Sequence, residues 1–499
     1  MCAHLVTPLI DATRMMRGAG GVGGDGPDRV ARRSLVAFRR VGRFVAVLLV
    51  LAGLSGAFAQ DPGSAQSGSS GPDSLTVEQA VARALETYPS VEAARRDVEA
   101  AQARIGQARS GYWPRLSAVG TYRRQDPVPE VTVPGTPTGP TGGRSIGIQP
   151  NNLYDGHLRL RQTLYDFGKT SARVDQAEAG RAAARQHVQL ERTELAFQVV
   201  QAYHATLLAG ARIDVQREQV AQLERTLEVV QRQQEAGTAT AFEVQSTKTR
   251  LSAARSQLTQ FRNERERQEA ELRRLLGRPT GTDLALRGSI QPRLSVADTA
   301  RIGADTLADH AVLEHPTVKV AQAQARAARR QVRVADRSDA PTLSLDARGG
   351  VKNGYPSDLN ELRLNESIGV SLQVPLFEGF ATERRLDEAE AQRQAAQARL
   401  TDARRQVSTG VEQAVADLRS VLDRLATTTL RVEQAETAAA LARTRYKAGT
   451  ITNLELLDAE TALREARLER TEVRYQVVIR RYALQRASGT LLPLGASVL

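Results

Sequence analysis

The feature that most constrains the fold of this chain is an internal duplication. Three segments of its second half repeat segments of its first half, each at a distance of 212 positions. A constant offset over the whole stretch means that both copies lack insertions relative to each other and span the same distance. The matched pairs are Leu164–Asp166 with Leu376–Glu378, Gln234–Thr240 with Tyr446–Thr452, and Arg274–Gly277 with Arg486–Gly489.

The residues between the matched segments predict two long helices in each copy, joined by a tight turn. No proline interrupts Lys169 to Ala236, and a helix of that length measures about 100 Å at ~1.5 Å per residue. Such a helix must bury a stripe against other helices. The expected stripes have heptad spacing, which is typical of a coiled coil and which a simple coiled-coil rod would also show. Their residues are Ala196, Val200, Tyr203 and Leu207; Val220, Leu223, Leu227 and Val230; and Val411, Val415, Leu418, Leu422 and Leu425.

The first 59 residues predict a secretory signal peptide. Several arginines precede the apolar run Phe44–Leu54, and Ala57-Phe58-Ala59 forms a small-x-small cleavage pattern before Gln60. The run is too short to span a membrane as a helix, which needs about twenty residues. No other apolar run approaches twenty residues, so if the mature protein spans a membrane it has to do so with strands. The only cysteine, Cys2, falls in the leader, which argues against disulfides and a cysteine-based metal site.

Two segments of each copy change from helical periodicity to alternation. Residues 114–124 and 156–165 are the expected strands of the first copy, and Leu343–Ala347 and Ile368–Leu376 lie in those of the second. Each strand is about ten residues long, which suits a tilted membrane strand with one apolar and one wet face. Half-buried strands of an ordinary hairpin are the alternative. The only tryptophan, Trp113, precedes the first strand, where an aromatic residue suits a membrane interface.

Glycines are expected to turn the chain from strand to helix. Gly168 and Gly379 follow the second strand of each copy, where the backbone has to adopt a conformation that other residues avoid. The distance between matched prolines, Pro114 and Pro341, is 227 positions, against 212 after the strands. The loop between the two strands therefore holds all of the extra residues of the first copy, which predicts a solvent-facing tip.

These motifs, taken in duplicate and in order, resemble the TolC-like outer-membrane efflux and secretion family. The residues that carry the resemblance are Leu75–Ala80, Tyr88-Pro89, Pro375–Gly379 and the two Ala-Gly-Thr turns. The resemblance implies an α+β membrane protein that forms a homotrimer in the outer membrane. Each chain would contribute four strands to a twelve-stranded β-barrel, and its long antiparallel coiled-coil helices would form a periplasmic α-barrel. The implied partners are outer-membrane lipid, a periplasmic adaptor protein and an inner-membrane pump.

The expected organisation follows from the repeat. It consists of a leader at 1–59, a linker at 60–74, a first repeat at 75–280, a linker at 281–300, a second repeat at 301–489 and a tail at 490–499.

The resemblance makes the two glycine turns the periplasmic tip, where the adaptor would bind. This carries adaptor contact onto Gly237, Thr238, Gly449 and Thr450. Glycine permits both a sharp reversal and the close approach of another backbone. A plain turn without a partner is the alternative.

A cluster of acids just past the second turn predicts a gate. Glu455 and Asp458 are three apart and share one helical face. The resemblance implies that such acids line a constricted entrance, where a carboxylate ring favours cations. Glu243 is the counterpart of Glu455 and is expected to bond Tyr446. Ile451 stands where the best-known members carry a basic residue, so a salt-bridge latch at that position would lack one half. The alternative is that the acids only stabilise helix N-termini.

Three function classes compete. A passive duct needs no catalysis and no cofactor. A periplasmic adaptor would have one helical hairpin with β-rich flanking domains, not two equal hairpins. An enzyme is disfavoured because the histidines are scattered, with His187 and His204 unpaired on a helix, and no phosphate loop or nucleophile elbow occurs. The net charge of +12 includes no basic run with interleaved aromatics, so we expect no nucleic-acid partner. A metal-efflux role stays open without a supporting metal site.

Overall fold

The computed structural model describes residues 74–133, 144–291, 303–356 and 358–492. All of them belong to one compact unit. The predicted leader, with its cleavage site at Ala59 and Gln60, lies outside the described residues. Within the part of the chain that is described, no helix is both long and apolar enough to pass through a membrane.

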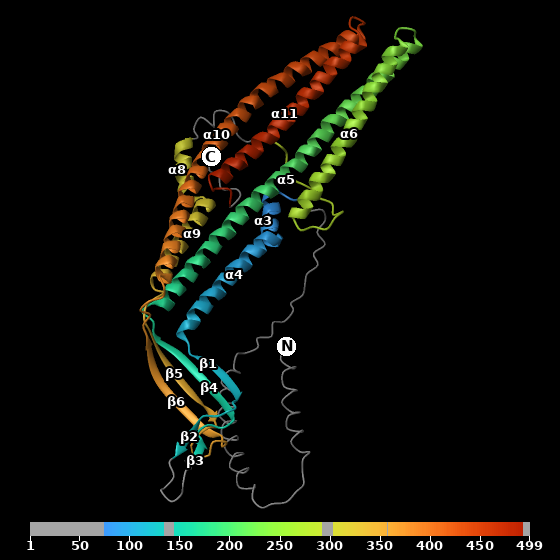
Figure 1. Cartoon of the computed structure of the whole chain (residues 1–499). Helices are drawn as coiled ribbons and strands as arrows, with labels where there is room; N and C mark the ends of the chain where they lie inside the picture. The colour runs from blue at the N-terminus through green and yellow to red at the C-terminus, as the bar shows by residue number, and fades with distance from the viewer. Residues whose placement is uncertain (1–73, 134–143, 292–302, 357, 493–499) are drawn as a thin grey trace, which may run out of the picture. The chain divides into compact units, whose positions relative to one another are not determined.

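The two repeats contain the same four helices in the same order (Figure 1). Corresponding helices have equal lengths of 11, 21, 67 and 35 residues. The long helices are followed by tight turns, as the duplication predicts. The first repeat holds α3 (Val77–Thr87), α4 (Pro89–Arg109), α5 (Lys169–Glu235) and α6 (Ala241–Leu275); the second holds α8 (Ala304–Glu314), α9 (Pro316–Asp336), α10 (Ala381–Lys447) and α11 (Asn453–Ala487).

Local sequence signals explain where the short helices start. The Thr76 hydroxyl accepts a hydrogen bond from the amide of Gln79 at 3.3 Å, and the Gln79 side chain accepts one from the Thr76 amide at 2.9 Å. This reciprocal pair is a capping box, and it satisfies two amides that the helix leaves free. Pro89 and Pro316 occupy the first position of α4 and α9, where the missing N–H costs nothing.

Four of the described strands form one antiparallel sheet that joins the two repeats. Its order is β1-β4-β5-β6, and a separate hairpin pairs β2 with β3. The predicted pairing of residues 114–124 with 156–165 is confirmed, with Ala118 opposite Leu158. The central β4–β5 pair connects the first repeat to the second. The strands are β1 (Arg115–Arg124), β2 (Glu130–Val133), β3 (Arg144–Gly147), β4 (Asn152–Tyr165), β5 (Thr342–Lys352) and β6 (Arg363–Gln373).

The four-stranded sheet has one apolar and one polar face. Large apolar side chains point to the same side of neighbouring strands and remain exposed, and the Tyr122 and Tyr154 rings lie 5.2 Å apart there. A continuous exposed apolar face needs a covering partner, and membrane strands have this pattern. Trp113 is 72% exposed at the junction of helix and strand. The exposed apolar residues include Leu116, Tyr122, Tyr154, Leu158, Leu164, Leu364, Ile368, Val370 and Leu372.

The strand-to-helix turns use two consecutive residues with positive φ. Gly168 and Gly379 adopt φ angles of +90° and +62°, as predicted for glycine. Each has a phenylalanine neighbour that also lies in the left-handed region, Phe167 at +51° and Phe380 at +63°. The order of the two residues is reversed between the copies, so Gly168 caps α5 whereas Phe380 caps α10. No sequence pattern predicts a phenylalanine in this strained conformation.

The predicted heptad stripes form the core. In the first repeat, α3 and α4 pack against α5, and in the second, α8 and α9 pack against α10. Helix α11 of the second repeat also packs along α5 of the first. The Tyr203 hydroxyl lies 2.8 Å from the carbonyl oxygen of Leu75 and 2.7 Å from that of Arg287. Burial raises the pKa of Tyr203 to about 12, so the phenol stays neutral.

Candidate functional site at the hairpin tips

The first hairpin (α5 and α6) and the second hairpin (α10 and α11) end in the same turn. Gly237 and Gly449 have φ angles of +75° and +69°. The Thr238 amide donates to the carbonyl of Gln233 at 2.8 Å, and the Thr450 amide donates to that of Arg445 at 3.0 Å. A Cβ added to either glycine would meet nothing within 4 Å. The backbone angle alone therefore favours glycine here, and the surface around both turns is open.

The second helix of each hairpin begins with a capping box. Glu243 accepts a hydrogen bond from the Thr240 amide at 2.7 Å, and Glu455 accepts one from the Thr452 amide at 2.7 Å. The hydrogen bond from the Thr452 backbone, followed by that from its side chain, lowers the pKa of Glu455. Both glutamates thus stabilise the start of their own helices. This is the alternative that the sequence left open for these acids.

Tyr446 connects the two hairpins, although not through the predicted partner. Its hydroxyl donates to the Gln233 side-chain oxygen at 2.8 Å, which joins α10 to α5. The expected hydrogen bond to Glu243 is wrong, because that carboxylate is engaged by Thr240. Burial, followed by the nearby charge of Glu243, raises the pKa of Tyr446. The tyrosine therefore stays protonated and able to donate.

Asp458 forms an ion pair across the hairpins. Its Oδ1 lies 2.9 Å from Nη2 of Arg250, which projects from α6 of the first hairpin. The side chain of Arg250 is 31% exposed and that of Asp458 is 63% exposed. Ile451, where the sequence suggested a missing basic partner, is not needed for this contact. The base comes from the other repeat.

A buried polar contact and an apolar cluster lie beside this ion pair. The side-chain Nδ2 of Asn453 donates to the Thr247 hydroxyl at 3.0 Å, and both side chains are buried. Leu457 of α11 packs against Leu223 of α5 and Leu251 of α6. Apolar burial holds the hairpins together here, and the polar pair fixes their register.

A second tier of contacts lies further from the turns. The carboxylate of Glu460, 1% exposed, accepts hydrogen bonds from Gln222 at 2.7 Å and from Arg443 at 3.3 Å. Its second oxygen has no partner among the described residues. Arg467 then bridges Glu218 of α5 and Glu436 of α10, at 2.8 and 2.9 Å. These contacts continue the link between the hairpins away from the tip.

The structure therefore divides the predicted gate residues into two groups. Asp458 and Tyr446 reach the other hairpin, whereas Glu243 and Glu455 bond within their own helix starts. The sequence missed Arg250, Thr247 and Asn453 because their partners lie about two hundred positions away. The comparison of the two copies does not single these residues out, because most positions of α6 and α11 differ between the copies.

The described residues contain no cluster of three or more His, Cys, Asp or Glu side chains that could hold a metal ion. The tips instead offer carboxylates, guanidinium groups and open turn backbones, which suit ion pairing and protein contact.

Comparison with known proteins places this architecture among outer-membrane proteins. The family described as outer membrane efflux protein matches residues 80–278 and 307–490. The alkaline protease secretion protein AprF of Pseudomonas aeruginosa is 27% identical over 394 residues, covering 79% of this chain and 80% of AprF. Protein CyaE of Bordetella pertussis is 29% identical over 424 residues, covering 84% and 85%. The crystal structure of the Campylobacter jejuni CmeC outer membrane channel superposes with a TM-score of 0.69 at 15% identity, covering 88% of this chain and 94% of CmeC.

Proposed function

The chain belongs to the outer membrane efflux protein family, and from this premise we propose how its repeats build and close a duct. As a member of that family it is an outer-membrane channel component of efflux or secretion that reaches into the periplasm. The adaptor alternative fails, because the chain has two equal hairpins, each preceded by two strands of the four-stranded sheet. The observation that best supports the duct function is a sheet with an exposed apolar face whose strands lead directly into 67-residue helices.

The duct is proposed to be a homotrimer. In the sheet formed by β1, β4, β5 and β6, β1 and β6 are edge strands. An open sheet edge is not tolerated in lipid, where every backbone polar group has to be paired. Pairing β6 of one copy with β1 of the next removes both edges, and three copies give the expected twelve strands. The same ring places six long hairpins side by side.

We propose that the cross-hairpin contacts at the tip hold the duct closed. The bonds Arg250–Asp458, Thr247–Asn453 and Gln233–Tyr446 keep the second hairpin against the first. Releasing them would let the second hairpin move outward and widen the entrance. In the trimer, Asp458 and Glu455 of each chain would also gather carboxylates near the axis, which favours cations.

Planar-bilayer conductance tests the gate. Asp458→Ala removes the partner of Arg250, so we expect conductance to rise at least ~2-fold and cation preference to fall. Glu455→Ala removes a cap and should change the conductance less. The double variant should resemble Asp458→Ala. Unchanged conductance and ion preference in the double variant would refute the gate while leaving the duct intact.

The turns are the proposed contact for a periplasmic adaptor, which would link the duct to an inner-membrane pump. Support comes from the open space around Gly237 and Gly449, which leaves the backbone accessible. Because the only natural cysteine is Cys2, a Gly449→Cys variant would offer a single accessible thiol after leader removal. A cross-link from this thiol to an adaptor in cells is expected. Absence of any adaptor adduct at either turn would contradict the assignment.

We propose that the duct carries polypeptide cargo. AprF carries secretion of alkaline protease in its name, which supports a type I secretion role with polypeptide cargo for this chain. Small-molecule efflux is the second candidate, supported by the family description. Deleting the gene and comparing secreted protein with drug susceptibility separates the two.

A further inference from the structure

The polar face of the four-stranded sheet carries an excess of basic side chains. The registers place alternate residues of all four strands on this face. Seven of them are basic and two are acidic, a difference of five positive charges per chain. The basic residues are Arg115, Arg123, Arg159, Arg161, Arg348, Lys352 and Arg363, and the acidic residues are Asp155 and Asp346.

The charges concentrate in two adjacent rows across the sheet. Arg115 lies opposite Arg161, which lies opposite Asp346. In the next row, Arg159 lies opposite Arg348. These rows therefore hold four arginines and one aspartate, a net charge of three per chain. Like charges directly opposite each other destabilise a sheet. Uncharged polar side chains would make this face just as hydrophilic without that cost.

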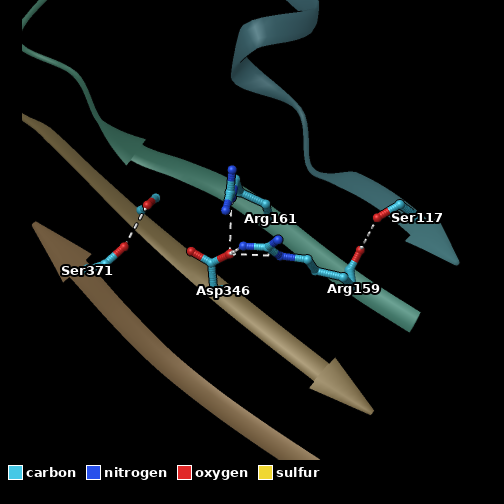
Figure 2. A network of polar contacts seen from close by, with 6 residues as sticks. Ser117, Arg159, Arg161, Asp346 and Ser371 are labelled. Carbon is cyan, nitrogen blue, oxygen red and sulfur yellow. Dashed lines mark hydrogen bonds and ion pairs between the residues drawn. The ribbon is translucent and has the colours of Figure 1, made fainter. Parts of the chain in front are cut away.

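One carboxylate serves two of the arginines (Figure 2). Asp346 Oδ1 accepts from Arg159 Nη2 at 3.0 Å and from Arg161 Nε at 3.0 Å. Both guanidinium groups turn toward that single oxygen in the view. Within the described residues, Arg115 and Arg348 form no ion pair, and both are exposed. The face thus presents the guanidinium groups of Arg115 and Arg348, which no acid in the described part of the chain neutralises.

We propose that this face forms an anion-selective segment inside the duct, which takes carboxylate-bearing cargo. The inference rests on the proposed trimer, in which the apolar face meets lipid and the polar face lines the passage. Three chains would then bring nine net positive charges from these two rows into one ring. A narrow passage with low-dielectric walls focuses such a field. Arginine binds carboxylates through two parallel hydrogen bonds, so the arginine rows match acidic groups on a passing molecule.

This segment opposes the charge preference proposed for the tip. The tip acids favour cations, whereas the arginine rows favour anions. Because the tip acids and the arginine rows are different residues, either set can be substituted while the other stays intact.

Reversal potentials of purified channels in asymmetric KCl test the proposal. In Arg159→Gln/Arg161→Gln, we expect the chloride-to-potassium permeability ratio to fall roughly threefold. In Asp346→Asn, we expect it to rise roughly twofold, because a negative charge is lost from the same rows. A folding defect would shift both variants in the same direction, so opposite shifts identify a charge effect. The matched control is Arg124→Gln, since Arg124 lies at the end of β1 on the opposite face.

Two further readouts define the outcome. The differences between variants should vanish near 1 M salt, where the screening length falls to about 3 Å. Added polyglutamate should block the wild-type channel, and should block the double arginine variant less, if the carboxylates belong to a polypeptide. Selectivity without such a block would assign the segment to small organic anions. A conducting channel with the same permeability ratio in all variants would overturn the inference and leave the duct standing. An absence of conductance would overturn both.

Discussion

At the tip of the first hairpin the chain reverses at Gly237 and starts its next helix with Thr240 and Glu243. At the tip of the second hairpin it reverses at Gly449 and starts its next helix with Thr452 and Glu455. The amides of the Ala-Gly-Thr residues make corresponding hydrogen bonds in the two turns, and the glycine φ angles are nearly the same. In contrast, the tip residues that form a hydrogen bond or ion pair with the other hairpin differ in type from their counterparts in the other copy. The divergent counterparts are Arg250 and Ala462, Ser246 and Asp458, Ala241 and Asn453, Thr247 and Ala459, and Gln234 and Tyr446.

This difference separates the residues that form a turn and helix cap from the residues that connect the two hairpin tips. A turn and a cap depend only on neighbouring residues, so both copies need them. A contact between the copies needs a donor on one side and an acceptor on the other, such as Arg250 and Asp458. Identical copies could not supply complementary partners at every point of such an asymmetric interface. Divergence at these positions therefore allows the two repeats to pair with each other.

The largest expected effect concerns a histidine that only the first repeat has. His204 is buried on α5, and its ring lies 5.7 Å from that of Tyr482 on α11. Its counterpart in the second repeat is Ala416. Burial lowers the pKa of His204 to about 4, from an ordinary value of 6.5, against the opposing charge of Glu78. The neutral ring is thus favoured in the folded state.

The sign of the pH effect follows from that direction. Above pH 6.5 the neutral His204 ring makes its full contribution to the free energy of unfolding. It is lost as pH falls from 6.5 to about 4, because the unfolded chain binds the proton first. The full loss is about 3 kcal/mol. We expect the melting temperature of His204→Phe to fall less on acidification than that of the wild type. The exposed His187 provides the control: His187→Phe should fall as the wild type does. Equal acid sensitivity in His204→Phe would contradict the assignment.

The second prediction exchanges residues between the copies at the tip. Asn453→Ala/Asp458→Ser gives the second tip the residues of the first. It removes the Thr247 and Arg250 contacts and should cost about 2 kcal/mol, mostly from the buried pair. The channel should open, with a higher conductance in bilayers.

The reverse exchange, Ala241→Asn/Ser246→Asp, is the matched control. The second copy has Ala459 and Ala462 at the positions equivalent to Thr247 and Arg250, and an alanine side chain offers no hydrogen bond or ion pair to the new side chains. Conductance should remain that of the wild type. A result in which both exchanges open the channel equally would break the proposed asymmetry.

The smallest expected effect concerns the capping boxes that the two tips share. Thr240→Ala and Thr452→Ala each remove the hydroxyl of a capping box with the same geometry. Each should destabilise its hairpin end by about 1 kcal/mol. Hydrogen exchange at the amides of the following turn would measure the two losses separately. A loss confined to one tip would show that the caps are not equivalent.

The parts of the fold that sequence could predict are those with local causes. The turns at Gly237 and Gly449, the strand alternation and the heptad stripes follow from neighbouring residues and their period. The partner of Asp458 could not be predicted, because Arg250 lies 208 positions earlier and no local pattern relates the two residues. The left-handed Phe167 and Phe380 were equally hidden, since aromatic residues rarely adopt that conformation.

A reversible lock between the hairpins tests most directly whether their contact closes the duct. Thr247 and Asn453 have short side chains whose polar atoms lie 3.0 Å apart, so a Thr247→Cys/Asn453→Cys variant should form a disulfide. We predict low conductance in bilayers under oxidising conditions and a rise above the wild-type value when reductant breaks the bond, with each single-cysteine variant indifferent to reductant. A disulfide that forms, as shown by electrophoresis, while conductance stays the same in both redox states would contradict the account.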